Sequence, residues 1–205
     1  MARQATELVK DVAIDLVFHH SRRVFLFGFL RGQDQGLDYD PELLYVGGMF
    51  HDLGLTETYR RTDQRFEIDA ADEARRFLHQ HGVDEDAADT VWAAIALHTT
   101  PQIPLHMAPE IALVTRGVEL DVLGIRFDAI TQDQRQAMVD AHPRPDFKNR
   151  IPAAFTDVKA DVLEHFVPGF QRGDFVEVIL RFPPDCGGLA ATRRPGWASR
   201  WTARN

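Results

Sequence analysis

The sequence predicts an all-α protein, and three observations lead to this fold class. Apolar residues recur at spacings of three and four, which places them on one side of a helix. Start and stop signals, such as Asp40-Pro41 and Gly124, bound the periodic segments. The alternation of period two that marks a strand is limited to one short, ambiguous segment, VEVILRF at residues 176–182.

The first two predicted helices carry clear patterns. One face of the first helix bears, at helical spacing, Val9, Val12, Leu16 and His20. The second helix begins at Asp40-Pro41-Glu42, where Asp is the N-cap, Pro fits the first turn and Glu lies near the positive end of the helix dipole. It runs to the adjacent pair His51-Asp52, and Gly54 is its stop signal.

Five further helices are predicted, each from an apolar stripe with a boundary signal. They cover residues 68–81, 84–98 and 109–121, a segment that starts at Thr131, and residues 156–166. Glycine lies just past the first and third of these segments, Thr-Thr-Pro breaks the second after His98, and Thr131 forms a capping box with Gln134.

A chain of 205 residues is long enough for one sizeable core and short for two. We therefore expect a single helical domain over residues 1–182. The segment 183–205 is rich in Gly, Arg, Ala and Pro and has no periodicity, so we expect an irregular or disordered tail there.

The amino-acid composition indicates which partners the protein can bind and in which compartment it is expected. The formal net charge is −8 and no basic run occurs, which argues against nucleic acid or an anionic membrane as a partner. Cys186 is the single cysteine, so a disulfide framework within the chain is excluded. The N-terminus lacks the apolar core of a signal peptide, and the longest apolar run, VFLFGFL at residues 24–30, is too short to span a membrane. We expect a cytoplasmic protein with a small-molecule substrate; homo-oligomerisation stays open.

Polar residues that can bind a metal lie on the apolar faces of four predicted helices: His20, His51, His98 and Asp121. Each alone is costly to bury, and a lone inward histidine is more often a hydrogen-bonded core residue than a ligand. From different helices, however, they can converge in the core of a bundle, where such sites are built. Imidazole and carboxylate suit Zn, Fe, Mn or Co.

Asp52 directly follows His51, and successive side chains do not share a helix face. Both can therefore reach one ion only where the chain is turning out of the helix. Gly47 and Gly48 weaken the helix but would let another helix approach one turn before the site. Five other histidines are expected at the surface or in loops: His79, His81, His106, His142 and His165. The run VFLFGFL fits either a pocket wall or simple core.

In this order on an all-α chain, His20, His51-Asp52 and Asp121 resemble the HD-domain superfamily of metal-dependent hydrolases, over residues 8–125. Four segments resemble its cyanamide-hydratase-like branch: HSRRV at 20–24, FHDLGLT at 50–56, RFEIDAADEA at 65–74 and VWAAIALHTT at 91–100. The resemblance implies an HD-domain helical bundle with one divalent ion in its core, zinc first and iron or manganese as alternatives. It implies as metal ligands His20, His51, Asp52 and Asp121.

The resemblance also implies a reaction, in which metal-bound hydroxide attacks a small nitrile-like carbon and hydrates it. Asp52 and His98 are the expected catalytic residues, His98 as a proton donor near neutral pH. Substrate-binding roles are expected for Arg23, Glu67 and Thr99. Arg23 fits equally a salt bridge to a carboxylate, Glu67 a favourable charge at a helix start, and Thr99 a cap.

Other chemistries stay open as alternatives. An HD-type phosphohydrolase on a nucleotide or other phosphate ester would use a basic pocket, for which four arginines are available: Arg22, Arg23, Arg60 and Arg61. Leu55 stands where nucleotide phosphatases of the superfamily carry a glutamate, and Phe66 stands where two-metal members carry a further histidine. These departures speak against a phosphatase and against a di-iron oxygenase. The complete ligand set speaks against a non-catalytic sensor.

Overall fold

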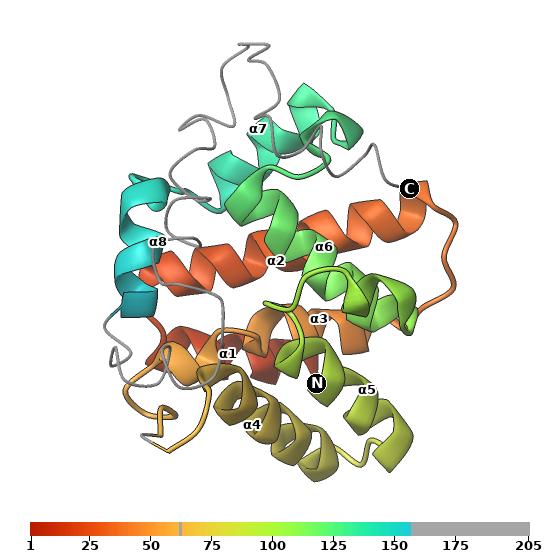
Figure 1. The fold of residues 1–205 in the computed structure, drawn as a ribbon, viewed down its shortest axis with the longest axis vertical. Coiled ribbons are helices and arrows are strands. Elements are labelled where there is room, and N and C mark those ends of the chain that lie inside the picture. The colour runs from red at the N-terminus through yellow and green to blue at the C-terminus, as the bar shows by residue number, and fades with distance from the viewer. Residues whose placement is uncertain (62, 157–205) are drawn as a thin grey trace.

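A computed structural model describes residues 1–61 and 63–156, and all regular structure within them is helical (Figure 1). The eight α-helices of this part of the chain are α1 Ala2–Val12, α2 Asp15–Asp34, α3 Pro41–Phe50, α4 Phe66–Gln80, α5 Glu85–Ala96, α6 Pro109–Leu123, α7 Gln132–Ala141 and α8 Phe147–Thr156. Short 3-10 helices cover Leu53–Leu55, Ile103–His106 and Phe127–Ala129. The all-α prediction is confirmed.

Three predicted features lie outside or at the edge of the described residues. These are the helix at 156–166, the ambiguous segment at 176–182 and the tail at 183–205. The helix α8, which ends at Thr156, was not predicted.

Helices α2 and α6 cross at the centre of the bundle in Figure 1, and a glycine sets how closely they pack. A Cβ atom at Gly117 of α6 would overlap the carbonyl oxygen of Val24 in α2. Only glycine therefore allows the two backbones to approach this closely. His20 lies one turn before Val24 and Asp121 one turn after Gly117, so the close approach brings these two side chains together.

Several predicted boundaries are confirmed by their hydrogen bonds. The Asp40 side chain accepts from the backbone N–H groups of Glu42 and Leu43 at the start of α3. Thr131 and Gln134 form both halves of a capping box on α7. Gly124 ends α6 with a left-handed φ of 65°. These signals are local, so they could be predicted without knowing the tertiary structure.

The predicted first helix is wrong in one respect, because the chain breaks at Ala13 and Ile14 and forms α1 and α2. The two halves of its apolar face bury in different places. Val9 packs in a cluster formed mainly by α1, α3, α4 and α5, whereas Leu16 packs against Val122 and α8. One straight helix cannot serve both clusters, so the inward position of His20 is fixed by α2 alone.

Glycines in α3 allow a neighbouring helix to approach, as predicted. A Cβ atom at Gly48 would lie 3.1 Å from the Cβ atom of Phe25 in α2. Phe25 belongs to the run VFLFGFL, whose Val24 and Phe27 are buried between helices. Those two residues of the run therefore serve as core.

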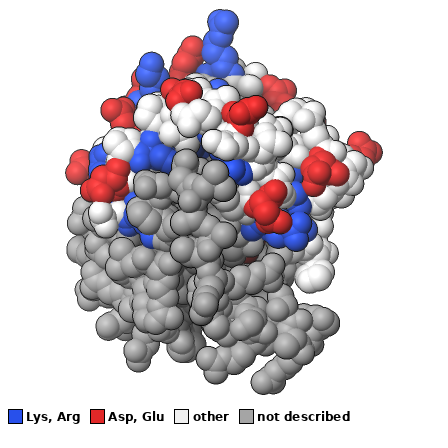
Figure 2. Space-filling view, turned by 90° about the horizontal axis from the view of Figure 1, so that it is seen from above, with Lys and Arg blue, Asp and Glu red and all other residues white. Residues whose placement is uncertain are grey.

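No helix in the described part of the chain combines the length and apolar character needed to cross a membrane. On the face drawn in Figure 2, basic and acidic side chains are interspersed over the described surface.

Candidate metal centre

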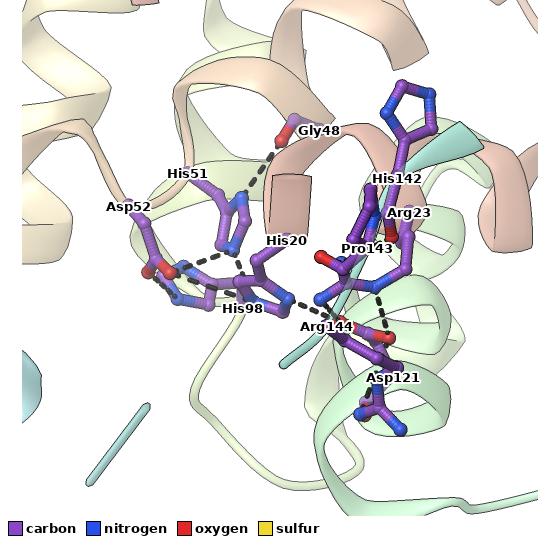
Figure 3. A network of polar contacts seen from close by, with 10 residues as sticks. All are labelled: His20, Arg23, Gly48, His51, Asp52, His98, Asp121, His142, Pro143 and Arg144. Carbon is purple, nitrogen blue, oxygen red and sulfur yellow. Dashed lines mark hydrogen bonds and ion pairs between the residues drawn. The ribbon is translucent and has the colours of Figure 1, made fainter. Parts of the chain in front are cut away.

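Four predicted site residues converge in the core from three parts of the chain (Figure 3). His20 comes from the first half of α2, His51 and Asp52 follow the end of α3, and His98 lies two residues past the end of α5. His20, His51 and Asp52 are fully buried and His98 is 3% exposed. The prediction that His98 belongs to the helix is wrong, since α5 ends at Ala96.

The side chains of His51 and Asp52 point to the same side because the backbone changes direction between them. His51 still has helical angles, with φ −53° and ψ −34°, whereas Asp52 has φ −104° and ψ 10° and is the N-cap of a 3-10 helix. The change in backbone direction brings two successive side chains to one side, as the prediction required.

Three of these residues form a compact group of potential ligand atoms. His20 Nε2 lies 3.2 Å from His51 Nε2, and Asp52 Oδ2 lies 3.6 Å and 3.3 Å from these two nitrogens. Tetrahedral zinc with bonds of about 2.1 Å places neighbouring donors about 3.4 Å apart. The three atoms therefore have the spacing that one ion needs.

Hydrogen bonds fix which ring nitrogen of each histidine faces the centre. His51 Nδ1 donates to the Gly48 carbonyl at 2.9 Å, and His98 Nδ1 donates to the Ile95 carbonyl at 2.6 Å. A carbonyl oxygen only accepts, so in the neutral rings the lone pairs are on Nε2. Histidines that bind metals typically donate their other N–H to a carbonyl or carboxylate in this way.

Asp52 and the imidazole nitrogens that face it are all hydrogen-bond acceptors when the rings are neutral. Both of its carboxylate oxygens are buried without a hydrogen-bond partner among the described residues. Its second oxygen, Oδ1, lies 3.6 Å from His98 Nε2. Buried acceptors that face one another without a donor are costly. A divalent cation would compensate them, and the residues present therefore fit a metal ion.

The charges of the group are strongly coupled. Burial alone would raise the pKa of Asp52, but the facing imidazoles, led by His51, hold it well below its ordinary value. Burial lowers the pKa of His20 and keeps this ring neutral. Burial also acts to lower the pKa of His51, but Asp52 outweighs it and raises the pKa. A cation would compete with protons for the ring nitrogens of this group.

Asp121, the fourth predicted ligand, is not part of the compact group. Its Oδ2 accepts a hydrogen bond from His20 Nδ1 at 2.7 Å, on the ring nitrogen opposite the one that faces His51. Burial would raise the pKa of Asp121, but Arg23 and His20 hold it far below its ordinary value.

Arg23 is fully buried and pairs with this carboxylate. Its Nε donates to Asp121 Oδ1 at 2.8 Å and its Nη2 to Asp121 Oδ2 at 2.9 Å. Its Nη1 donates to the carbonyls of His142 and Pro143 at 3.0 and 3.1 Å. Of the two roles predicted for Arg23, these contacts describe the salt bridge. Arg144, which sequence reasoning missed, donates from Nη2 to the Asp121 carbonyl at 2.8 Å.

Glu67 and Thr99 form a second polar cluster next to His98. Thr99 Oγ1 donates to Glu67 Oε1 at 2.6 Å, and Arg65 forms a salt bridge with the same carboxylate. Burial would raise the pKa of Glu67, but Arg65 and the nearby His98 lower it. The structure thus brings two of the three predicted substrate-binding residues together. Arg65 was missed; it is the N-cap residue of α4, where no functional pattern marks it.

Comparisons with known proteins identify the family of the chain. Residues 17–123 match the HD domain. Two proteins of Saccharomyces cerevisiae, cyanamide hydratase DDI2 and cyanamide hydratase DDI3, are each 30% identical to this chain over 132 residues, which is 62% of the chain. The chain spans 59% of the length of these relatives.

The matched segment runs from α2 to the end of α6 and contains both the compact group and Asp121. It covers more than half of the 205 residues. The chain therefore belongs to the HD domain family.

Proposed function

We propose that this protein is a metal-dependent hydratase that adds water to a small nitrile-like substrate such as cyanamide. The observation that carries the proposal is the buried group of acceptors formed by Asp52 and the imidazoles that face it, which lacks a compensating donor. The likeness to the two yeast cyanamide hydratases supports the substrate class.

The residues divide into those that hold an ion and those that act beside it. His20, His51 and Asp52 would hold one divalent ion, with zinc preferred and iron or manganese compatible with the same donors. Such an ion would lower the pKa of a bound water towards neutrality. Asp52 presents Oδ2 to the two histidines and keeps Oδ1, which would accept a hydrogen bond from water and orient it.

The proposed reaction adds one water across the carbon–nitrogen triple bond. The water oxygen forms a bond to carbon, one bond of the triple bond breaks, and a proton goes to the nitrogen, which gives isourea without a leaving group. Isourea becomes urea when the hydroxyl proton moves from oxygen to the same nitrogen. His98 would move the first of these protons at Nε2, since its Nδ1 is held by the Ile95 carbonyl.

Glu67 and Thr99 are proposed to bind the substrate. Glu67 is 3% exposed, adjoins His98 and has its charge balanced by Arg65. An anionic carboxylate suits the N–H groups of cyanamide. Thr99 follows His98 in sequence and fixes the orientation of the Glu67 carboxylate through its hydroxyl.

A phosphohydrolase would use a basic pocket, but two of the four arginines available for one already have partners in the protein. Arg23 is occupied by Asp121 and two carbonyls. Arg22 contacts the Tyr45 hydroxyl and His142. These two contributors to a basic pocket are therefore engaged within the protein.

The first test is the metal content of the purified protein by elemental mass spectrometry, with His51→Ala as the control. We expect about one zinc or iron per chain, lost in the variant. Urea release from cyanamide is then measured beside phosphate release from a panel of nucleotides and phosphate esters. Absence of metal after reconstitution would overturn the proposal, and phosphate release without urea release would replace it by the phosphohydrolase.

A further inference from the structure

Arg65, Glu67 and Thr99 form a closed ring of hydrogen bonds next to His98. Arg65 Nε donates to Glu67 Oε2 at 3.2 Å, and Arg65 Nη2 donates to Glu67 Oε1 and, at 3.1 Å, to Thr99 Oγ1. Thr99 Oγ1 donates its single proton to Glu67 Oε1 at 2.6 Å. Both carboxylate oxygens are therefore held, and the bidentate contact with the guanidinium fixes the orientation of the carboxylate.

The ring of hydrogen bonds connects the surface of the protein to the candidate site. The Glu67 side chain is 3% exposed, whereas that of Arg65 is 31% exposed. Glu67 lies within electrostatic reach of His98. Phe66, between the two charged residues in sequence, packs against His98 with 5.8 Å between the ring centroids. Glu67 is thus the inner member of the ring of hydrogen bonds and Arg65 the outer one.

The position of Arg65 is unfavourable for the helix that follows it. Arg65 is the N-cap of α4, and its side chain makes no capping hydrogen bond. N-cap positions favour Ser, Thr, Asp and Asn, and a positive charge at this end opposes the helix dipole. Local helix stability therefore does not explain an arginine here, and sequences break such local rules mainly at functional sites.

The backbone around Arg65 is held by contacts that do not involve its side chain. Asp69 of α4 accepts a hydrogen bond from the backbone N–H of Arg61 at 2.8 Å. A Cβ atom at Gly54 would overlap the carbonyl oxygen of Phe66, so the start of α4 packs closely against the 3-10 helix Leu53–Leu55. A substitution of the Arg65 side chain leaves these contacts in place, so its effect on the site can be separated from an effect on the fold.

We infer that Arg65 is a positioning residue for the proposed hydration, and that it acts through Glu67. Arg65 holds the Glu67 carboxylate in one orientation next to His98, where the carboxylate accepts from the N–H groups of the substrate. A lysine would supply the charge but not the planar fork that reaches both oxygens and Thr99. The inference rests on the proposed function and assigns Arg65 no contact with the substrate.

The test compares Arg65→Met with Arg75→Met in steady-state kinetics with cyanamide, and the metal content of each sample is measured. Arg75 is the matched control, because it also joins α4 to α5, through Asp89, and its side chain is 34% exposed. We expect both variants to keep the ion. Arg65→Met should raise KM about 10- to 100-fold, as loss of a hydrogen bond to a charged group does, while kcat stays nearly unchanged. An unchanged KM in Arg65→Met, or the same rise in Arg75→Met, would overturn the inference.

A crystal structure of Arg65→Met gives a readout that does not depend on turnover. We expect the Glu67 carboxylate to leave its wild-type orientation, and an unchanged orientation would overturn the inference. If Arg65→Met does not fold, Arg65→Lys decides, since it keeps a positive charge next to Glu67. Its KM should lie between those of wild type and Glu67→Gln, and a KM equal to that of wild type would overturn the inference. Wild-type protein that releases no urea would overturn the proposed function, and the inference with it, before any variant is compared.

Discussion

Asp52 and Asp121 are both buried carboxylates, and both contact the same histidine, yet their surroundings are opposite. Asp121 accepts from Arg23 and His20 and lies beside Arg144, so its charge is compensated within the protein. Asp52 faces imidazole nitrogens and has no hydrogen-bond partner among the described residues. The comparison teaches that two equally buried carboxylates can differ in how their charge is compensated, and that an inventory of their donors shows the difference.

The largest effect is expected from a substitution of Asp52, the carboxylate without hydrogen-bond partners. Asp52→Asn should abolish both metal uptake and turnover. In the metal-free protein the amide can still donate to a facing Nε2, so the free energy of unfolding should change by no more than about 1 kcal/mol. Urea unfolding of metal-free wild type and variant checks this. A large loss of stability would mean that Asp52 supports the fold and not an ion.

The next effect concerns His98, which faces the second oxygen of Asp52. His98→Gln should retain the ion but lower kcat about 10²- to 10⁴-fold, since it removes the proposed proton donor. Metal content and steady-state kinetics are measured on the same preparation. Normal turnover would remove His98 from the mechanism, and loss of the ion would make it a ligand.

Arg23→Met tests how strongly the charge of Asp121 depends on its arginine partner. It leaves Asp121 as a buried charge with one of its main partners removed, which should cost about 3–5 kcal/mol in the free energy of unfolding. Arg22→Met on the same helix is the matched control, and because Arg22 is half-buried its loss should stay below about 1 kcal/mol. Similar losses in urea unfolding would contradict the special position of Arg23.

The smallest effect is a pH dependence near Asp121. Burial and then the charges of Arg22 and His19 lower the pKa of His142 from 6.5 to about 4, with Arg23 adding to the effect. Between these values the unfolded chain binds more protons at this residue than the folded protein, so stability falls as the pH is lowered through the window. In His142→Gln the loss between pH 7 and pH 5 should be smaller than in wild type. An unchanged pH profile would refute this role.

Local signals allowed most of the fold to be predicted. The caps at Asp40, Thr131 and Gly124 act through hydrogen bonds within a few residues, so they are visible in the sequence. The break at Ala13 and Ile14 carries no glycine or proline and results from packing against two separate clusters. Tertiary packing of this kind leaves no local pattern.

The site was predictable as a set of inward-facing residues, because helical periodicity tells which side chains are buried. Periodicity does not tell which neighbour a buried oxygen meets. The sequence therefore placed Asp121 in the core, but it could not show that its oxygens accept from Arg23 and His20 Nδ1. Arg65 and Arg144 were missed for the same reason, since both lie outside the helix interiors and act through tertiary contacts.

The pairing of Arg23 with Asp121 also has a consequence for the evolution of these two positions. Replacing only one of the two residues would leave the other as a buried, uncompensated charge. A protein with one of the two substitutions would therefore be less stable than a protein with neither. Among relatives of this chain, the two positions should change together or not at all. A relative that loses both would have to support His20 with a different acceptor, and the residue that takes over could be found by looking for a new oxygen beside Nδ1.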